Sequence, residues 1–470
     1  MELKRSILLY FVLVGVPAVG VLEIIHAGHG IETGISAGSN MPGVSQDGTP
    51  VHLPLLLVQV AVILVLARTV GLAFRAIRQP QVIGEMVAGL LLGPSVLGWI
   101  SPGLSASLFP AGSLGLLNPL SQIGLVFYMF LVGLRLDPER LRSHRHTAFL
   151  TSHTSIIFPF TLGAILALYL YPRLSDRHGS FVAFALFLGT AMSVTAFPVL
   201  ARILTDLKLL QTPVGTVTMA CAAVDDVTAW CILASIVLQV RAMTAATPFW
   251  AMPLAVVAYT LTMLFGVRRA LSKLDLIAVI EGGLSQNILA LFMILVIASA
   301  TMTELLGIHA LFGAFLMGVI TPKEREFVRL LSEKLEGMTV VLLLPLFFAF
   351  TGLRTSIGLV SGTRMWFYCG LIIAVAILGK FGGSLLSARL NGLSWREAGA
   401  IGVLMNTRGL MELVVLNVGL DIGAISQTVF TMMVLMALVT TFMATPLLEW
   451  IYPAGARSTV PVLARKASAF

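Results

Sequence analysis

The chain has 470 residues, of which 57% are hydrophobic and 11% are charged, and its formal net charge at pH 7 is +8. Soluble domains carry about 25% charged residues, so this composition excludes a soluble globular protein and indicates a polytopic helical membrane protein. The positive charge does not indicate a nucleic-acid partner, because the basic residues fall in loops between apolar segments. Cys221, Cys231 and Cys369 lie inside apolar segments without CxxC or Cys/His spacing, which argues against a zinc site or a disulfide framework.

The N-terminal region, residues 1–52, begins with the basic sequence MELKRS and continues into an apolar run over residues 6–25. This run is either a signal-like segment or an extra helix, and the Gly/Ser-rich stretch 26–52 is expected to be an extracytoplasmic loop. Residues 53–451 form the expected membrane domain, and residues 452–470 the expected short cytoplasmic tail. Apolar runs of the kind that span a bilayer predict thirteen helices in the membrane domain, at residues 53–75, 81–98, 119–135, 147–172, 179–205, 213–240, 250–266, 285–303, 307–321, 338–355, 366–388, 397–420 and 427–451.

The distribution of basic residues supports this count. If residues 1–5 lie on the inner side and the chain crosses at each segment, most of the 30 Lys and Arg residues fall in inner loops. Short cytoplasmic loops carry an excess of Lys and Arg. We therefore expect an all-α, multi-pass protein of the bacterial plasma membrane, with the lipid bilayer as a partner and without nucleic acid.

The segment 179–205 is expected to be a broken helix. Pro198 follows the polar residues Ser193 and Thr195 in the sequence LFLGTAMSVTAFPVLARIL. Proline removes one backbone hydrogen bond and clashes with the preceding turn. The hydroxyl and carbonyl oxygens released at such a break suit a dehydrated alkali cation.

The segment 213–240 carries two adjacent aspartates, Asp225 and Asp226, near its middle, with no other charge within ten residues. At about 1.5 Å rise per residue, the pair falls close to the midplane of a bilayer whose hydrocarbon core is roughly 30 Å thick. A carboxylate at that depth costs at least about 2.5 kcal/mol on insertion scales and indicates a functional site. The pair is therefore expected to bind a proton, a metal cation or a fixed ammonium group.

Further charges lie in the last part of the chain. Lys380 is near the middle of segment 366–388 and needs a carboxylate partner to stay charged when buried. Arg408 and Glu412 have the i,i+4 spacing that places them on one helix face, so they either pair with each other or belong to the moving machinery. We expect all three to compensate charge within the membrane.

The segment 397–420 is a second candidate for a broken helix. Asn406, Thr407 and Gly409 lie at a depth comparable to the first break, in the second half of the chain. Interrupted helices in corresponding halves point to a transporter built from inverted repeats, and their half-helix ends offer dipole ends to an ion. Ordinary Pro and Gly kinks are the alternative interpretation.

Six sequence blocks occur in a characteristic order along the chain. They are QPQVIGEMVAGLLLGPSVLG (79–98), GLVFYMFLVGLRLD (124–137), AMSVTAFPVLARIL (191–204), AAVDDVTAW (222–230), LPLFFAFTGLRT (344–355) and MNTRGLMELVVLNVG (405–419). Together they resemble the monovalent cation:proton antiporter-2 family, and most closely its bacterial and plant cation/proton exchanger branch. The resemblance covers nearly all of residues 53–451.

The resemblance implies about thirteen transmembrane helices in two inverted repeats, with the two broken helices crossing beside Asp226, in addition to the N-terminal apolar segment. It implies a homodimer and places the essential cation and proton site at Asp226. Asp225 together with Lys380 looks like the electrogenic sodium/proton type. No GxGxxG motif follows residue 451, so a nucleotide-binding regulatory domain is not expected. The implied transport core comprises segments 147–172, 179–205, 213–240, 366–388, 397–420 and 427–451. The other helices form the implied dimerisation domain, with 250–266 as the connector.

The sequence thus predicts a secondary active transporter, not an enzyme, that exchanges monovalent cations for protons without a cofactor. Burial and mutual repulsion favour protonation of the two aspartates near neutral pH. We expect Asp226, with Asp225 beside it, to bind Na⁺ or K⁺ with help from Ser193 and Thr195, while Lys380 pairs with Asp225 when no cation is bound. Na⁺ is favoured and Li⁺ is a further candidate. A K⁺/H⁺ antiporter of the same fold is the alternative, and a cation channel is a more remote one.

Overall fold

The computed structural model describes residues 17–25 except 18 and 22, and residues 53–110, 114–135, 145–175, 180–210, 212–242, 251–273, 284–306 and 308–453. The predicted loop 26–52 and nearly all of the predicted tail 452–470 lie outside these residues, as does most of the apolar run 6–25. All regular secondary structure in the described part is helical, which confirms the all-α prediction.

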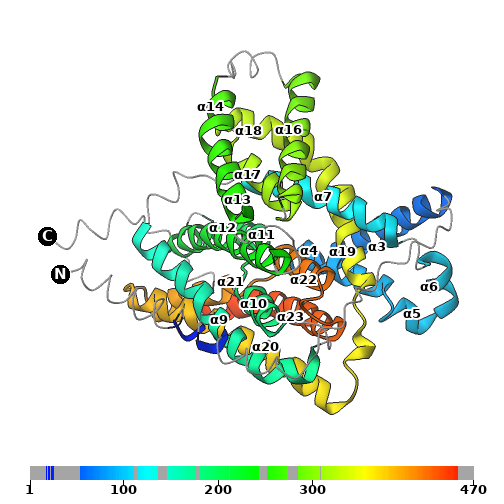
Figure 1. Cartoon of the computed structure of the whole chain (residues 1–470). Helices are drawn as coiled ribbons and strands as arrows, with labels where there is room; N and C mark the ends of the chain where they lie inside the picture. The colour runs from blue at the N-terminus through cyan, green and yellow to red at the C-terminus, as the bar shows by residue number, and fades with distance from the viewer. Residues whose placement is uncertain are drawn as a thin grey trace.

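The helices pack as two groups (Figure 1). In the core group, α9 contacts α10, α12 and α20, while α21 and α23 pack on α20. In the flanking group, α4 contacts α3 and α19, and α7 contacts α17 and α19. The core group comprises α9 (Arg145–Leu174), α10 (Phe181–Ser193), α11 (Phe197–Asp206), α12 (Pro213–Ala242), α20 (Gly362–Leu390), α21 (Trp395–Met405), α22 (Leu410–Asp421) and α23 (Gln427–Ile451). The flanking group comprises α3 (Leu53–Ala76), α4 (Gln81–Leu92), α7 (Leu114–Arg135), α16 (Gln286–Leu305), α17 (Ala310–Ile320), α18 (Arg325–Met338) and α19 (Leu344–Leu353).

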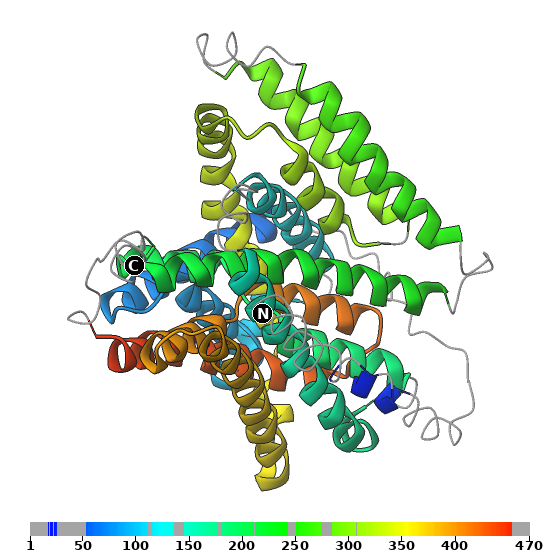
Figure 2. The same ribbon diagram turned by 90° about the vertical axis from the view of Figure 1, so that its left-hand side faces the viewer.

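The remaining helical pieces connect or extend these groups. A continuous helix of α13 (Ala251–Leu261), η3 (Thr262–Val267) and α14 (Arg268–Leu271) follows α12 and lies beside the flanking helices in Figure 1. Two short helices, α5 (Leu97–Ile100) and α6 (Pro102–Leu108), follow α4. Figure 2 shows α12 in green as a long helix through the middle of the molecule.

Each of the thirteen predicted segments coincides with a helix or a broken helix in the described residues. Ten helices there are long and apolar enough to cross a membrane, and the bent pair α21–α22 makes eleven if it counts as one span. The other two predicted segments are α10 with α11, and α17, whose 11 residues extend only about 16 Å. The membrane architecture is therefore confirmed, while the count of about thirteen holds for apolar segments rather than for full-length helices.

One region differs from the expectation. The charged stretch 323–334 is predicted as an inner loop, but most of it forms α18, which continues through η4 (Thr339–Leu343) into α19. Arg329 pairs with Glu333 one turn later at 2.8 Å, and Phe327 and Leu331 are buried on the opposite side. Because this helix is amphipathic rather than apolar, hydropathy alone does not reveal it.

Glycines bring the flanking helices into backbone contact. A Cβ atom on Gly352 of α19 would lie 2.0 Å from the carbonyl carbon of Gly89 on α4, and one on Gly133 of α7 would lie 2.2 Å from the carbonyl oxygen of Phe315 on α17. Small residues permit such close approach between membrane helices. The flanking helices therefore touch backbone to backbone at these crossings.

Candidate functional site

The two broken helices meet in the core group. After α10 ends at Ser193, residues 194–196 are not helical, and α11 begins at Phe197 with Pro198 in its first turn. Proline is well tolerated in the first turn of a helix, so the break precedes Pro198. The second break separates α21 from α22, whose axes differ by 42°. The backbone N–H of Ala196 donates to the carbonyl of Thr407 at 3.0 Å, so the predicted crossing of the broken helices is confirmed.

Three residues of the second break were predicted from the sequence, and each has a different environment. The Thr407 hydroxyl donates to the carbonyl of Leu404 at 2.8 Å, which closes the end of α21. A Cβ atom on Gly409 would lie 2.9 Å from a methyl group of Val199 on α11, so only glycine fits there without a shift. The side-chain oxygen of Asn406 is buried without a hydrogen-bond partner in the described residues.

Arg408 ties the second break to the end of α10. Its two terminal nitrogens donate to the carbonyls of Ala191 and Met192 at 2.6 and 2.7 Å. These carbonyls belong to the last turn of α10, where cations are favourable. Glu412 lies 3.7 Å from the guanidinium group, and neither of its oxygens has a hydrogen bond within the described part of the chain. The predicted contact between Arg408 and Glu412 is thus present but loose, because the short bonds of Arg408 go to α10.

Asp225 lies near the middle of α12 and is 1% exposed. The Lys380 ammonium group of α20 donates to its Oδ2 atom at 2.7 Å, and the Thr195 hydroxyl donates to the same atom at 2.9 Å. The hydroxyls of Ser152 and Ser155 on α9 reach the carboxylate at 2.5 and 2.9 Å. Asp225 is therefore a buried carboxylate whose two oxygens accept hydrogen bonds from protein groups, with one fixed positive charge beside it.

Asp226 differs sharply from its neighbour. It is also 1% exposed, but neither of its oxygens has a hydrogen-bond partner among the described residues. The backbone N–H of Phe197, at the start of α11, donates to the carbonyl of Thr195 at 3.1 Å. A buried carboxylate without partners is unstable as an anion, so this one is suited to hold a proton or a cation.

Two predicted helpers of the cation site lie differently from the expectation. The Ser193 hydroxyl lies 2.7 Å from the carbonyl of Gly189 and 2.9 Å from that of Ile156, whereas its own carbonyl accepts from Lys380. Back-bonding to the preceding turn is a common alternative for serine in a helix. The Thr195 hydroxyl reaches Asp225 rather than Asp226. The sequence interpretation did not single out Ser152 and Ser155, although their i,i+3 spacing on an apolar segment was a weak signal.

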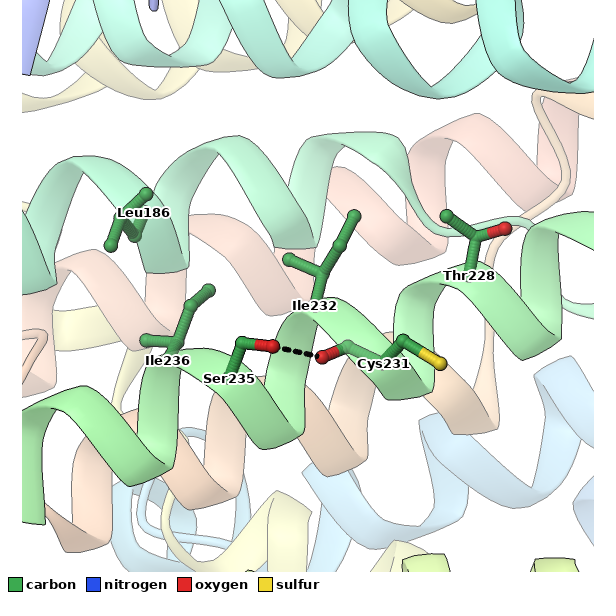
Figure 3. Close-up of a pocket in the computed structure, with 6 residues that line it drawn as sticks. All are labelled: Leu186, Thr228, Cys231, Ile232, Ser235 and Ile236. Carbon is green, nitrogen blue, oxygen red and sulfur yellow. Dashed lines mark hydrogen bonds between the residues drawn. The ribbon is translucent and has the colours of Figure 1, made fainter. Parts of the chain in front are cut away.

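A shallow hollow of about 310 Å³ lies farther along α12. Thr228, Cys231 and Ser235 line it from α12 and Leu186 from α10, and the Ser235 hydroxyl donates to the Cys231 carbonyl at 2.7 Å (Figure 3). Neither aspartate lines this hollow. No cluster of three or more His, Cys, Asp or Glu residues that could hold a metal ion occurs among the residues described, so a cation at Asp226 would depend on hydroxyl, carbonyl or water oxygens as well.

Comparison with known proteins shows one consistent relationship. Residues 61–452 match the family described as "Sodium/hydrogen exchanger, transmembrane". "Na(+)/H(+) antiporter NhaS4" of Synechocystis sp. is 47% identical over 86% of this chain and 98% of that protein. "Cation/H(+) antiporter 17" of Arabidopsis thaliana is 40% identical over 88% of this chain, and "K(+)/H(+) antiporter 1" of Saccharomyces cerevisiae is 36% identical over 89%. The chain spans about half the length of these plant and yeast relatives.

A solved structure shows the same fold. The sodium proton antiporter MjNhaP1 from Methanocaldococcus jannaschii matches with a TM-score of 0.62 over 86% of this chain and 98% of that chain. The two sequences are 14% identical, so the likeness concerns the arrangement of helices and not the chemistry of the site.

Proposed function

The chain belongs to the sodium/hydrogen exchanger family, and from this premise we propose that it exchanges monovalent cations for protons at Asp226. It is a multi-pass protein of the cell membrane, and its closely similar relatives are cation/proton antiporters by name. The site is assigned to Asp226 because the two aspartates differ in their hydrogen-bond partners. Asp225 is satisfied by an ammonium group and hydroxyls, while Asp226 is buried without a partner.

The exchange follows from competition for one carboxylate. A proton and a cation each neutralise Asp226, and both cannot do so at once. Carbonyl and hydroxyl oxygens lie at the crossing of the broken helices, on Thr195 and at the end of α21, and the Thr195 hydroxyl contacts the adjacent Asp225. Lys380 pairs with Asp225 in the cation-free state. Cation entry weakens that pair by adding a second positive charge nearby and favours loss of a proton from the ammonium group, so that more than one proton leaves for each cation bound.

Transport further requires that the site face each side of the membrane in turn. In inverted-repeat transporters this occurs by movement of one helix bundle against another. The core group carries the whole site, and the flanking helices pack more extensively on one another than on the core group. We infer that the core group moves against the flanking group, that the flanking group forms the homodimer contact, and that residues 53–451 make up the exchanging unit.

Na⁺ is the proposed cation, and the presence of both Asp225 and Lys380 supports an electrogenic cycle. The 47% identity to a protein named as an Na⁺/H⁺ antiporter favours Na⁺. The yeast relative named as a K⁺/H⁺ antiporter, at 36% identity, makes K⁺ the second candidate.

Exchange in proteoliposomes tests the proposal. The purified chain is reconstituted with an internal pH indicator, and Na⁺, Li⁺ or K⁺ is added in turn under an imposed membrane potential. We expect cation-dependent proton movement that changes with the potential and is abolished by Asp226→Asn. Glu333→Gln is the matched control, because it alters an exposed carboxylate on α18, and this variant should exchange normally. Exchange that persists in Asp226→Asn would refute the site, and current without proton exchange would indicate a channel.

A further inference from the structure

Three hydroxyl groups surround Asp225, and the number of protons that they carry constrains what they do. A hydroxyl has one proton to donate. The Ser152 hydroxyl lies 2.5 Å from Oδ1 of Asp225, and this is its one hydrogen bond to the described residues. The Ser155 hydroxyl lies 2.9 Å from Oδ2 and 2.8 Å from the carbonyl of Ser152, so it can donate to either. The Thr195 hydroxyl has a similar choice between Oδ2 and the carbonyl of Met405 at 3.1 Å.

The Lys380 ammonium group is equally well matched to its surroundings. Its three N–H donors meet Oδ2 of Asp225, the carbonyl of Ser155 at 3.0 Å and the carbonyl of Ser193. Lys380 therefore does not depend on Asp225 alone, and Asp225 does not depend on Lys380 alone. If the two separate, the hydroxyls of Ser152 and Ser155 can still donate to both carboxylate oxygens.

We infer that Ser152 and Ser155 are positioning residues of the exchange reaction. Their hydroxyls contact both oxygens of the Asp225 carboxylate and keep it turned toward Lys380, so that Asp226 is the carboxylate that changes its ligand during the cycle. This inference rests on the proposed function and adds two α9 residues to it. It also assigns different tasks to two adjacent side chains of the same type: Asp225 maintains a fixed negative charge, and Asp226 binds the transported ion or proton.

The charges that face Asp225 set the expected effect of losing the hydroxyls. Asp226 is adjacent on α12, Lys380 approaches from α20, Arg408 at the second break lies within electrostatic range of Lys380, and the Cys221 thiol lies one turn earlier on α12. Without the serine donors, Asp225 binds a proton more readily. The surroundings of Asp226 then lose one negative charge, and a cation is attracted less strongly to Asp226.

The test compares Ser152→Ala, Ser155→Ala and the double variant with the unmodified chain. Sodium-dependent exchange is measured in proteoliposomes from pH 6 to 9, and stabilisation of the purified protein against heat by NaCl is measured over the same range. Loss of a hydrogen bond to a charged group corresponds to about one pH unit. We expect both curves to move to higher pH by about one unit in Ser152→Ala and further in the double variant. Ser152→Thr, which retains the hydroxyl, should move them back.

Two controls separate this role from a general packing effect. Ser121 is equally buried but donates to Asn118 on its own helix α7, so Ser121→Ala should leave both curves in place. In an Asp225→Asn background, Ser152→Ala should cause no further shift, because no carboxylate is left to position. Superimposable curves for Ser152→Ala and the unmodified chain, or an equal shift in the Asp225→Asn background, would overturn the inference. Failure of the unmodified chain to exchange any cation would instead refute the proposed function, and the NaCl stabilisation curves would still decide the inference.

Discussion

Replacement of Lys380 by methionine should destabilise the core group by about 3 kcal/mol. The ammonium group is fully buried and lies 2.7 Å from Oδ2 of Asp225. Removing one partner of a buried ion pair costs about 3–5 kcal/mol. Asp225 keeps the donors Ser152 and Ser155, which places the loss at the lower end of that range. Methionine has a similar length and shape, so a cavity adds little to the cost.

A double-mutant cycle isolates this interaction. Unfolding of the purified protein is followed by reversible SDS titration in mixed micelles for Lys380→Met, Asp225→Asn and the combined variant. We expect the combined variant to be at least about 2 kcal/mol more stable than the sum of the single changes predicts, because the second substitution removes the uncompensated charge. Additivity to within about 0.5 kcal/mol would show that the contact contributes no net coupling and would refute the reasoning.

Three further changes have clear expected outcomes. Gly352→Ala would press a methyl group against the Gly89 backbone and should lower the free energy of unfolding by about 3 kcal/mol in the same titration. Gly337→Ala adds a methyl group with no atom within 4 Å, inside helix α18, and should raise the free energy of unfolding by about 0.5 kcal/mol. If Gly352→Ala were the more stable variant, the close crossing would be contradicted. Arg408→Lys should cost about 1–2 kcal/mol, because one ammonium group cannot reproduce two parallel hydrogen bonds to α10, and an unchanged midpoint would exclude this capping role. Thr195→Val should slow exchange in proteoliposomes about tenfold through loss of a donor to Asp225, a prediction that an unaltered rate would refute.

Much of the fold could be predicted from the sequence because its determinants are local. Apolar length marks the helices, Pro198 marks the first break through a restriction that acts within a few residues, and Gly409 marks the second because glycine is a poor helix former. Helix α18 was missed because its apolar residues occupy one face and its mean hydropathy is therefore low. The count of spans was less accurate than the positions of the segments, because a short helix such as α17 is apolar without being long enough to cross a bilayer.

The site was predictable in its charges but not in its hydroxyl groups. A buried lysine requires an acceptor, and the structure places Lys380 against Asp225. A buried serine, by contrast, can always bond the carbonyl of the preceding turn, as Ser193 does. Residue type therefore does not tell which serine faces a carboxylate. Whether Ser152 or Ser193 does so depends on the rotation of a whole helix about its axis, which is decided by packing between helices distant in sequence.

The contacts between the two helix groups limit how the site can be exposed. Within the core group, the crossing is fixed by Arg408 and by the backbone bond from Ala196 to Thr407. Between the groups, Arg354 at the end of α19 donates to Asn417 at 3.0 Å and to Asp421 at 2.6 Å on α22. If the core group moves as a body, the first set of bonds persists and the second must break. Because Arg354 and Asp421 are partly exposed, with side chains 18% and 40% accessible, water can replace that pair at small cost. Asn417 also donates to the hydroxyl of Thr351 on α19 at 3.0 Å, and both side chains are buried, so this contact costs more to break than the exposed pair of Arg354 and Asp421.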